Sequence, residues 1–447
     1  MKPSKLLIFT GFFLLGCNIA KAQFNDFLNY PLTVAPHESP DSTRGHFWGY
    51  MFGSYFDKVH ADTLGRGNTQ YSGSTLGKGS NEFSLERVYL GYDYFFNAQF
   101  SVHAVMAYEE TNDNAFGAVT TLQNYDRSFY LKYANMEWTN MFNTGLKLSV
   151  GAITTPSFAI TEEPFWGYRS IDRTIMDMKG ITGSNDFGVN IGGKIWRKKD
   201  DAGNENACVG FNFMVGNSTG AIPDVPGITS NYTTWKKYYG NLYVKLFNDK
   251  VLLDLYGDGH TFSWTDIPAN GVMHQYEVTG RIFLGYKTKN FNISAEYFKQ
   301  LEKNMVDEVS GPGVPASGDT ADNIQSGYSI MTAVVLLRDK KTGASKLTAF
   351  ARYDYYNPDN TYNSQIYYEP GGMYVDGQKK NVVIPWIENY FVIGLDFQPI
   401  KQIHFMPNLW YDGIHDQSYN SIPATPLQKF DYDLVPRITF YYQFFKN

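Results

Sequence analysis

The stretch that decides the fold is QYEVTGRIFLGYK, residues Gln275–Lys287, because its apolar and polar residues alternate. One parity is apolar or aromatic apart from one glycine: Tyr276, Val278, Gly280, Ile282, Leu284 and Tyr286. The other parity carries polar and charged residues: Glu277, Thr279, Arg281 and Lys287. A period of two is the pattern of a β-strand with one apolar face and one wet face.

About sixteen such segments follow one another between Phe47 and Phe444. Phe83–Phe95 and Leu434–Phe444 show the same alternation clearly. Because neighbouring segments would run in opposite directions, an even number places both chain ends on the same side of the structure.

The connections between the segments alternate between short and long. The short ones are rich in Asn, Asp and Gly, as tight turns require: 97–99, 248–250, 288–290, 339–345 and 399–402. The long ones are 57–82, 109–127, 154–186, 217–237, 299–327 and 357–389. Transmembrane barrels have short periplasmic turns and long extracellular loops. The sequence therefore predicts an all-β fold, a transmembrane antiparallel β-barrel of about 16 strands over residues 45–447.

The composition agrees with a barrel surrounded by lipid. Aromatic residues make up 17% of the 447 residues, and charged residues only 18%. Barrels use aromatic side chains as girdles at both membrane interfaces. After the N-terminus, no stretch approaches the roughly 18 apolar residues of a spanning helix. Because lipid offers no hydrogen-bond partner to the backbone, a spanning chain of this kind must close into a barrel.

The N-terminus has the pattern of an export signal. Lys2 and Lys5 precede an apolar core, Leu6–Leu15, and a small-x-small site ends at Ala22. This pattern predicts a secretory signal peptide over residues 1–22, cleaved after Ala22, and a location in the outer membrane of a Gram-negative bacterium.

Two further features concern the same region. Leu14–Cys17 resembles a lipoprotein box, so a lipidated Cys17 is the alternative to cleavage after Ala22. Residues 23–44 are polar and contain three prolines, which predicts a flexible N-terminal extension.

Charge and motifs exclude several kinds of partner. Loss of Lys2, Lys5 and Lys21 with the signal peptide would take the formal net charge from −6 to −9, which argues against nucleic acid as a partner.

Asp254 and Asp258 share a strand face but lie roughly 13 Å apart along the strand at about 3.3 Å per residue, too far to bind one metal ion together. The sequence predicts neither a metal site nor a cofactor.

Leu148–Gly193 carries a family resemblance. Val150–Phe158, Gly167–Arg169 and Asp186–Val189 resemble the third-loop region of outer-membrane porins of the phosphate-selective (O/P) type. The resemblance implies a third loop, residues 154–186, that folds into the barrel and narrows the pore, and it implies a homotrimer.

Two sets of candidate residues follow. The resemblance implies a pore constriction on the third loop: Glu162, Arg169, Asp172, Arg173, Asp177 and Lys179. The alternative for this set is a solvated loop held by surface ion pairs. Strand parity predicts pore-lining residues: Arg87, Asp93, Lys194, Lys245, Asp254, Asp258, Glu277, Arg281, Glu296, Arg352, Asp354 and Arg437. The two charge signs are mixed in both sets, which does not favour selectivity for phosphate.

We therefore expect a porin for passive diffusion of small hydrophilic solutes or ions, without enzymatic activity. Its expected partners are outer-membrane lipid, the diffusing solutes and further copies of itself in a homotrimer. One alternative is an outer-membrane barrel enzyme such as a lipid hydrolase, which would need a Ser–His pair facing lipid. Another is a structural or secretion-associated barrel, whose lumen packed loops would block.

Overall fold

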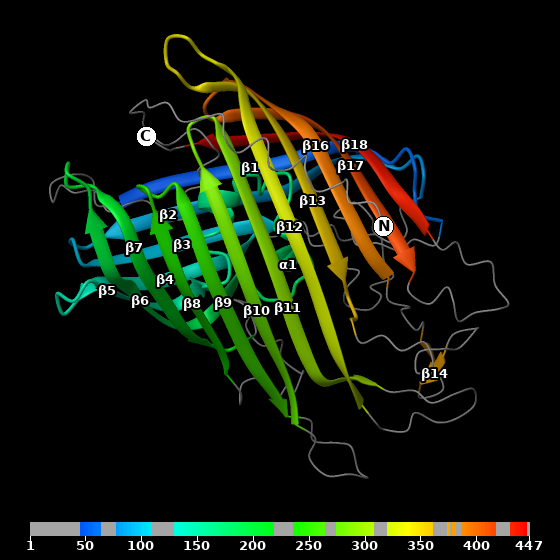
Figure 1. The fold of residues 1–447 in the computed structure, drawn as a ribbon, viewed down its shortest axis with the longest axis horizontal. Helices are drawn as coiled ribbons and strands as arrows, with labels where there is room; N and C mark the ends of the chain where they lie inside the picture. The colour runs from blue at the N-terminus through cyan, green and yellow to red at the C-terminus, as the bar shows by residue number, and fades with distance from the viewer. Residues whose placement is uncertain are drawn as a thin grey trace, which may run out of the picture.

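The computed structural model is a closed barrel of sixteen antiparallel strands (Figure 1). It describes residues 45–63, 77–109, 129–218, 236–263, 274–307, 320–360, 373–375, 378–380, 386–416 and 430–444. The predicted signal peptide, residues 1–22, and the predicted extension, residues 23–44, lie outside the described residues.

The barrel strands are β1 (Gly45–Asp57), β2 (Asn81–Phe95), β3 (Phe100–Glu109), β4 (Tyr130–Met141), β5 (Leu146–Thr154), β6 (Asn185–Lys199), β7 (Glu205–Gly216), β8 (Lys237–Leu246), β9 (Val251–Ser263), β10 (His274–Lys287), β11 (Phe291–Asp307), β12 (Thr320–Arg338), β13 (Ser345–Asn357), β16 (Trp386–Ile400), β17 (Ile403–Asp416) and β18 (Phe430–Phe444). A small separate hairpin consists of β14 (Met373–Val375) and β15 (Gln378–Lys380). Among the described residues, no helix has the length and apolar character needed to cross a membrane.

Each strand pairs with its sequence neighbours in the barrel, and β1 pairs with β18 to close the sheet. Gly49 lies opposite Phe444 across the closing pair, and Gly45 lies opposite Tyr94 on β2. Both ends of the barrel sequence therefore lie at the end where the short turns are, here called the short-turn end. The predicted number of strands and antiparallel barrel are confirmed.

The alternation of side chains is also as predicted. On β10, Arg281 and Phe283 point inward and are buried, whereas Ile282 and Leu284 point outward and are 51% and 52% exposed. Similar exposed apolar side chains recur on strands around the barrel, among them Val189, Phe213, Leu255, Ile293, Ile330, Ile393, Phe405 and Ile438. The outer wall is thus suited to contact with lipid.

Bulges shift this alternation at several places in the described strands, and two of them turn charged side chains inward. The broken parity of Ser128–Trp138 predicts a bulge between Tyr133 and Met136, but the structure has the irregularity at Lys132, where Val105 faces Tyr133 and Met106 faces Leu131. Lys132 and Tyr133 are consequently both buried. A bulge adds a residue to one strand and re-aims its side chain, which parity alone does not locate.

The second bulge lies between β1 and β2. The register shifts between Phe52 and Ser54 of β1, and the neighbours Glu86 and Arg87 of β2 are both buried. Only Arg87 was expected inside from the alternation of this strand.

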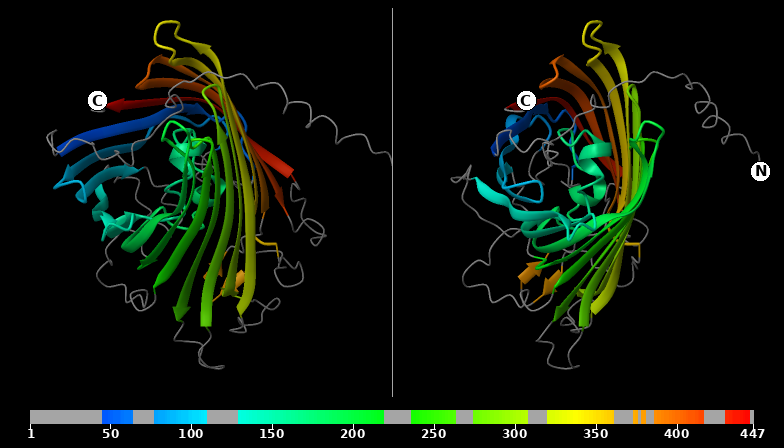
Figure 2. Two further views of the ribbon diagram at one scale, coloured as in Figure 1. Left: turned by 60° about the vertical axis from the view of Figure 1, so that its left-hand side comes forward. Right: turned by 90° about the vertical axis from the view of Figure 1, so that its left-hand side faces the viewer.

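The segment between β5 and β6 folds into the barrel, where it forms the helical turns η2 (Glu162–Trp166) and α1 (Ile175–Met178), drawn in green-cyan inside the ring of strands in Figure 2. We call residues 155–184 the third loop. It packs on inward aromatic side chains of the wall in a cluster that includes Trp48, Tyr50, Phe52, Tyr390 and Trp410. The interior of the barrel is therefore partly apolar, because the third loop packs against the wall through apolar side chains.

We expect a charge on the outer face at mid-depth to destabilise the barrel. Replacement of Ile282 by Lys should lower the free energy of folding into lipid vesicles by about 2–4 kcal/mol, because the ammonium would face hydrocarbon. The matched control Asn135→Lys adds the same charge to the lumen side of β4. Equal effects of the two substitutions on denaturant unfolding in vesicles would contradict the assignment of outer and inner faces.

Candidate functional site: the third loop and the lumen wall

The third loop is fastened first to β10, β11 and β12. Lys287 Nζ donates a hydrogen bond to the Pro164 carbonyl oxygen at 2.9 Å, and Asn292 Nδ2 donates to that of Phe165 at 2.7 Å. Further along, the backbone N–H of Ile175 donates to Ser329 Oγ at 2.9 Å. These contacts satisfy backbone groups that the short helical turns leave unpaired.

A second set of contacts joins the loop to β13, β16 and β18. The Arg352 guanidinium lies over the Trp166 ring, 5.1 Å from its centroid. Tyr168 donates to Asp396 Oδ2 at 3.3 Å, and Arg437 donates to the Ile171 carbonyl oxygen at 3.3 Å. These polar contacts thus join the loop to strands between β10 and β18.

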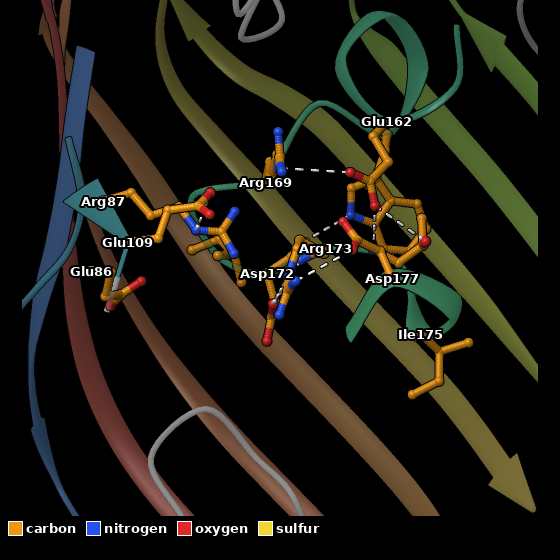
Figure 3. Close-up of polar contacts among 12 residues, drawn as sticks. Glu86, Arg87, Glu109, Glu162, Arg169, Asp172, Arg173, Ile175 and Asp177 are labelled. Atoms are coloured by element: carbon orange, nitrogen blue, oxygen red, sulfur yellow. Dashed lines mark hydrogen bonds and ion pairs between the residues drawn. The ribbon is translucent and has the colours of Figure 1, made fainter. Parts of the chain in front are cut away.

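The predicted constriction residues lie close together on this loop (Figure 3). Arg169 Nε is 3.6 Å from Glu162 Oε2, and Arg173 Nη1 donates to Asp177 Oδ1 at 3.3 Å. Asp172 is buried, and the Arg173 side chain keeps 30% of its exposure. This burial does not fit the alternative of a solvated loop held by surface ion pairs. The role of the set as a constriction stays a prediction.

Lys179 differs from the other predicted constriction residues because its ion-pair partner lies on the barrel wall. Its ammonium pairs with Glu388 on β16, and both side chains are almost fully buried. Lys179 therefore ties the loop to the wall.

A group of charged wall residues on β2, β3 and β4 lies near Arg169 (Figure 3 shows Arg87 and Glu109). Lys132 Nζ is 2.6 Å from Glu109 Oε1, and Arg87 Nε is 3.8 Å from the same oxygen. Glu86, beside Arg87, pairs with Arg437 of β18 at 2.6 Å.

Glu86, Glu109 and Lys132 are absent from the residues predicted from the sequence. The two bulges turn Glu86 and Lys132 inward, and Glu109 falls in a segment predicted as a loop. The one available signal was the broken parity of β4.

Most predicted pore-lining residues point inward, but several lie behind the third loop. Arg281 on β10 pairs with Asp254 and lies 3.6 Å from Glu296, and all three are buried while Arg281 also donates to the Ser157 carbonyl oxygen. Arg352 pairs in the same way with Asp354 on its own strand. These five residues hold the loop instead of lining open lumen, because the loop covers this part of the wall.

The remaining predicted lining residues are spread over the barrel. Asp258 and Glu277 share Lys237 as partner, at 3.3 and 2.8 Å. Lys194 is paired with Glu205 at 2.5 Å and is the least buried member of the set. Asp93 and Lys245 line a cavity on the other side of the third loop.

That cavity has a volume of about 330 Å³ and lies between the wall formed by β1 to β8 and the edge of the third loop. It reaches the β2–β3 turn at Asn97 and Gln99, and therefore the short-turn end. The loop contributes Pro156, Ile160 and Pro164 to its lining.

Burial changes the acidity of one loop carboxyl. Glu162 accepts hydrogen bonds from the Thr174 N–H and hydroxyl, at 3.0 and 3.2 Å. Burial, reinforced by the charge of Asp177, raises the pKa of Glu162 to about 7. The charge of the loop wall therefore changes in the neutral pH range.

The comparisons with known proteins support the fold. The sequence matches no protein-family model, and no curated protein matches it. Pseudomonas putida OprB, solved at high pH, is 9% identical, with 90% of this chain and 94% of that chain covered and a TM-score of 0.53. An anion-selective porin from Comamonas acidovorans is 10% identical over 90% and 99% of the chains, with a TM-score of 0.49. Identities this low show only a shared fold, that of an outer-membrane β-barrel.

We expect the ion selectivity of the barrel to depend on pH through Glu162. Between pH 6 and pH 8 this carboxyl loses its proton and adds a negative charge to the loop wall, so the preference for cations should rise. The reversal potential under a salt gradient measures this change, with Glu162→Gln as the variant that keeps the shape of the side chain. A wild-type reversal potential that stays constant over this range, or an equal shift in the variant, would contradict the assignment.

Proposed function

We propose that this protein is a passive channel for small hydrophilic solutes or ions across a bacterial outer membrane. The proposal rests on the third loop, which folds into the barrel and carries charges of both signs near a second group of charged wall residues. Charges and diameter at a narrow point decide which solutes pass through a channel.

Two further proposals concern location and assembly. The exposed apolar side chains on the outer wall support an outer-membrane location, and a signal peptide cleaved after Ala22 would direct the chain there. A homotrimer is supported by small outward residues such as Gly257, Gly259 and Ala295, which permit close contact between barrels.

The finer proposal of a phosphate-selective porin has weaker support. Arg87, Lys132 and Arg169 would attract anions, but Glu109 and Glu162 lie among them, each within 4 Å of a basic group. Opposed charges of this kind orient a dipolar solute and give no strong preference for one sign.

A hydrolase is the competing function, and one arrangement favours it. His103 on β3 lies between Asp93, at 2.7 Å from Nδ1, and Ser101, at 2.9 Å from Nε2, which is the order of a catalytic triad. However, Nε2 is also 3.6 Å from Glu137, so two carboxylates bracket the ring. An ion-pair network describes these contacts better than a nucleophile with its base, and the group faces the lumen instead of lipid.

A structural barrel blocked by packed loops is the other alternative. The apolar cluster inside the barrel includes Phe165 and Trp166 of the loop, Phe283 and Met331 of the β9–β18 side, and Trp48, Tyr89 and Val105 of β1 to β3. The cavity on the β1–β8 side supports passage beside the loop.

Planar-bilayer recording of the purified mature protein tests the proposal, with discrete conductance steps as the expected result. Replacement of Arg169 and Arg173 together by Ala should widen the constriction, raise the conductance and shift the reversal potential toward cations. The control Lys340→Ala/Lys341→Ala removes two exposed charges from the β12–β13 turn. A conductance and reversal potential unchanged in the arginine variant would mean that the third loop does not form the constriction.

A further inference from the structure

The cavity beside the third loop has one polar wall and one apolar wall. The polar wall contains a row of inward residues that are direct partners across four strands: Ser101 on β3, Glu137 on β4, Ser149 on β5 and Asn190 on β6. Asn135 and Asn212 extend it with two more amides. Hydroxyl and amide groups therefore dominate this face.

The charged groups in the cavity are largely satisfied by one another. Asp93 accepts a hydrogen bond from Trp48 Nε1 at 2.9 Å and pairs with His103. Glu137 is 2.8 Å from Lys147 Nζ. A charged solute would have to break these pairs in order to gain new ones.

The unsatisfied groups of the cavity are neutral acceptors. The side-chain oxygens of Asn135 and Asn190 have no hydrogen-bond partner within the described part of the chain, although Asn190 is only 8% exposed. A buried acceptor without a partner costs free energy, so such oxygens mark a place where a donor from outside would bind.

The opposite wall supplies apolar contact. It consists of Pro156, Ile160 and Pro164 from the loop, and the inward rings of Trp48 and Tyr133 adjoin it from the strands. The hydrogen bond from Trp48 to Asp93 fixes the indole ring in place. Ligand sites commonly combine such apolar faces with a few placed polar groups, in cavities of about 300–1,000 Å³.

We propose that this cavity binds a neutral polyhydroxylated solute, a mono- or oligosaccharide, on its way through the channel. The hydroxyl groups donate to the free oxygens of Asn135 and Asn190, and the C–H face of the sugar ring packs on Trp48 and the loop prolines. The assignment rests on the proposed channel function and adds its class of solute.

The test is block of single-channel current by sugar added at the short-turn side. Glucose and sucrose should reduce the wild-type current in a saturable manner, and gluconate, of similar size but charged, should do so less. Asn135→Ala/Asn190→Ala should raise the half-blocking sugar concentration about tenfold, the effect expected from the loss of two neutral hydrogen bonds.

The matched control is Asn323→Ala, which removes an inward amide near the other end of the barrel, where Asn323 donates to Glu302. It should leave sugar block unchanged. Gluconate block as strong as glucose block, or equal glucose block in the double variant and the wild type, would overturn the sugar site. The channel function would still be supported in that case if the wild-type protein conducts ions. Absence of any wild-type conductance would overturn both.

Discussion

The pairing of β1 with β18 is the contact on which the rest of the structure depends. It joins residues about 390 positions apart in the chain, Phe52 with Tyr441 for example, and closes the sixteen-stranded sheet into a ring. In lipid an unpaired backbone group costs several kcal/mol, so a sheet with a free edge would not be stable there. Closure also fixes the circumference, and with it the space that the third loop must fill or leave open.

The third loop also has backbone groups that need hydrogen-bond partners. It is irregular backbone inside a barrel, so its carbonyl and N–H groups need partners that the sheet does not provide. Asn292, Ser294 and Arg437 supply donors to it from the wall, and Ser329 supplies an acceptor. Many of the inward charges therefore secure the loop, and those facing the β1–β8 side pair largely with one another.

The barrel architecture could be predicted from the sequence because two features can be read from short stretches of it: the alternation of side chains within each strand and the length of each connection. The alternation in Gln275–Lys287 is local and needs no knowledge of neighbours. The inward turn of Lys132 and Glu86 could not be predicted in this way, because a bulge depends on the register with the next strand.

The candidate site was predictable only in part, for a similar reason. The charged residues of the third loop stand out in the sequence, but a partner on the wall can lie far away in the chain, as Glu388 lies 209 positions from Lys179. Strand parity predicts that Arg281 and Asp254 point inward, but parity does not say which part of the wall a loop will cover.

We propose that solutes pass between the third loop and the β1–β8 wall. The most direct measurement is modification of single cysteines by a charged thiosulfonate during bilayer recording, in a Cys208→Ser background. Asn212→Cys lies in the cavity and Ser294→Cys lies behind the loop, where Ser294 donates to Phe165. We expect a stepwise loss of current for Asn212→Cys and none for Ser294→Cys. Block through Ser294→Cys alone would contradict it.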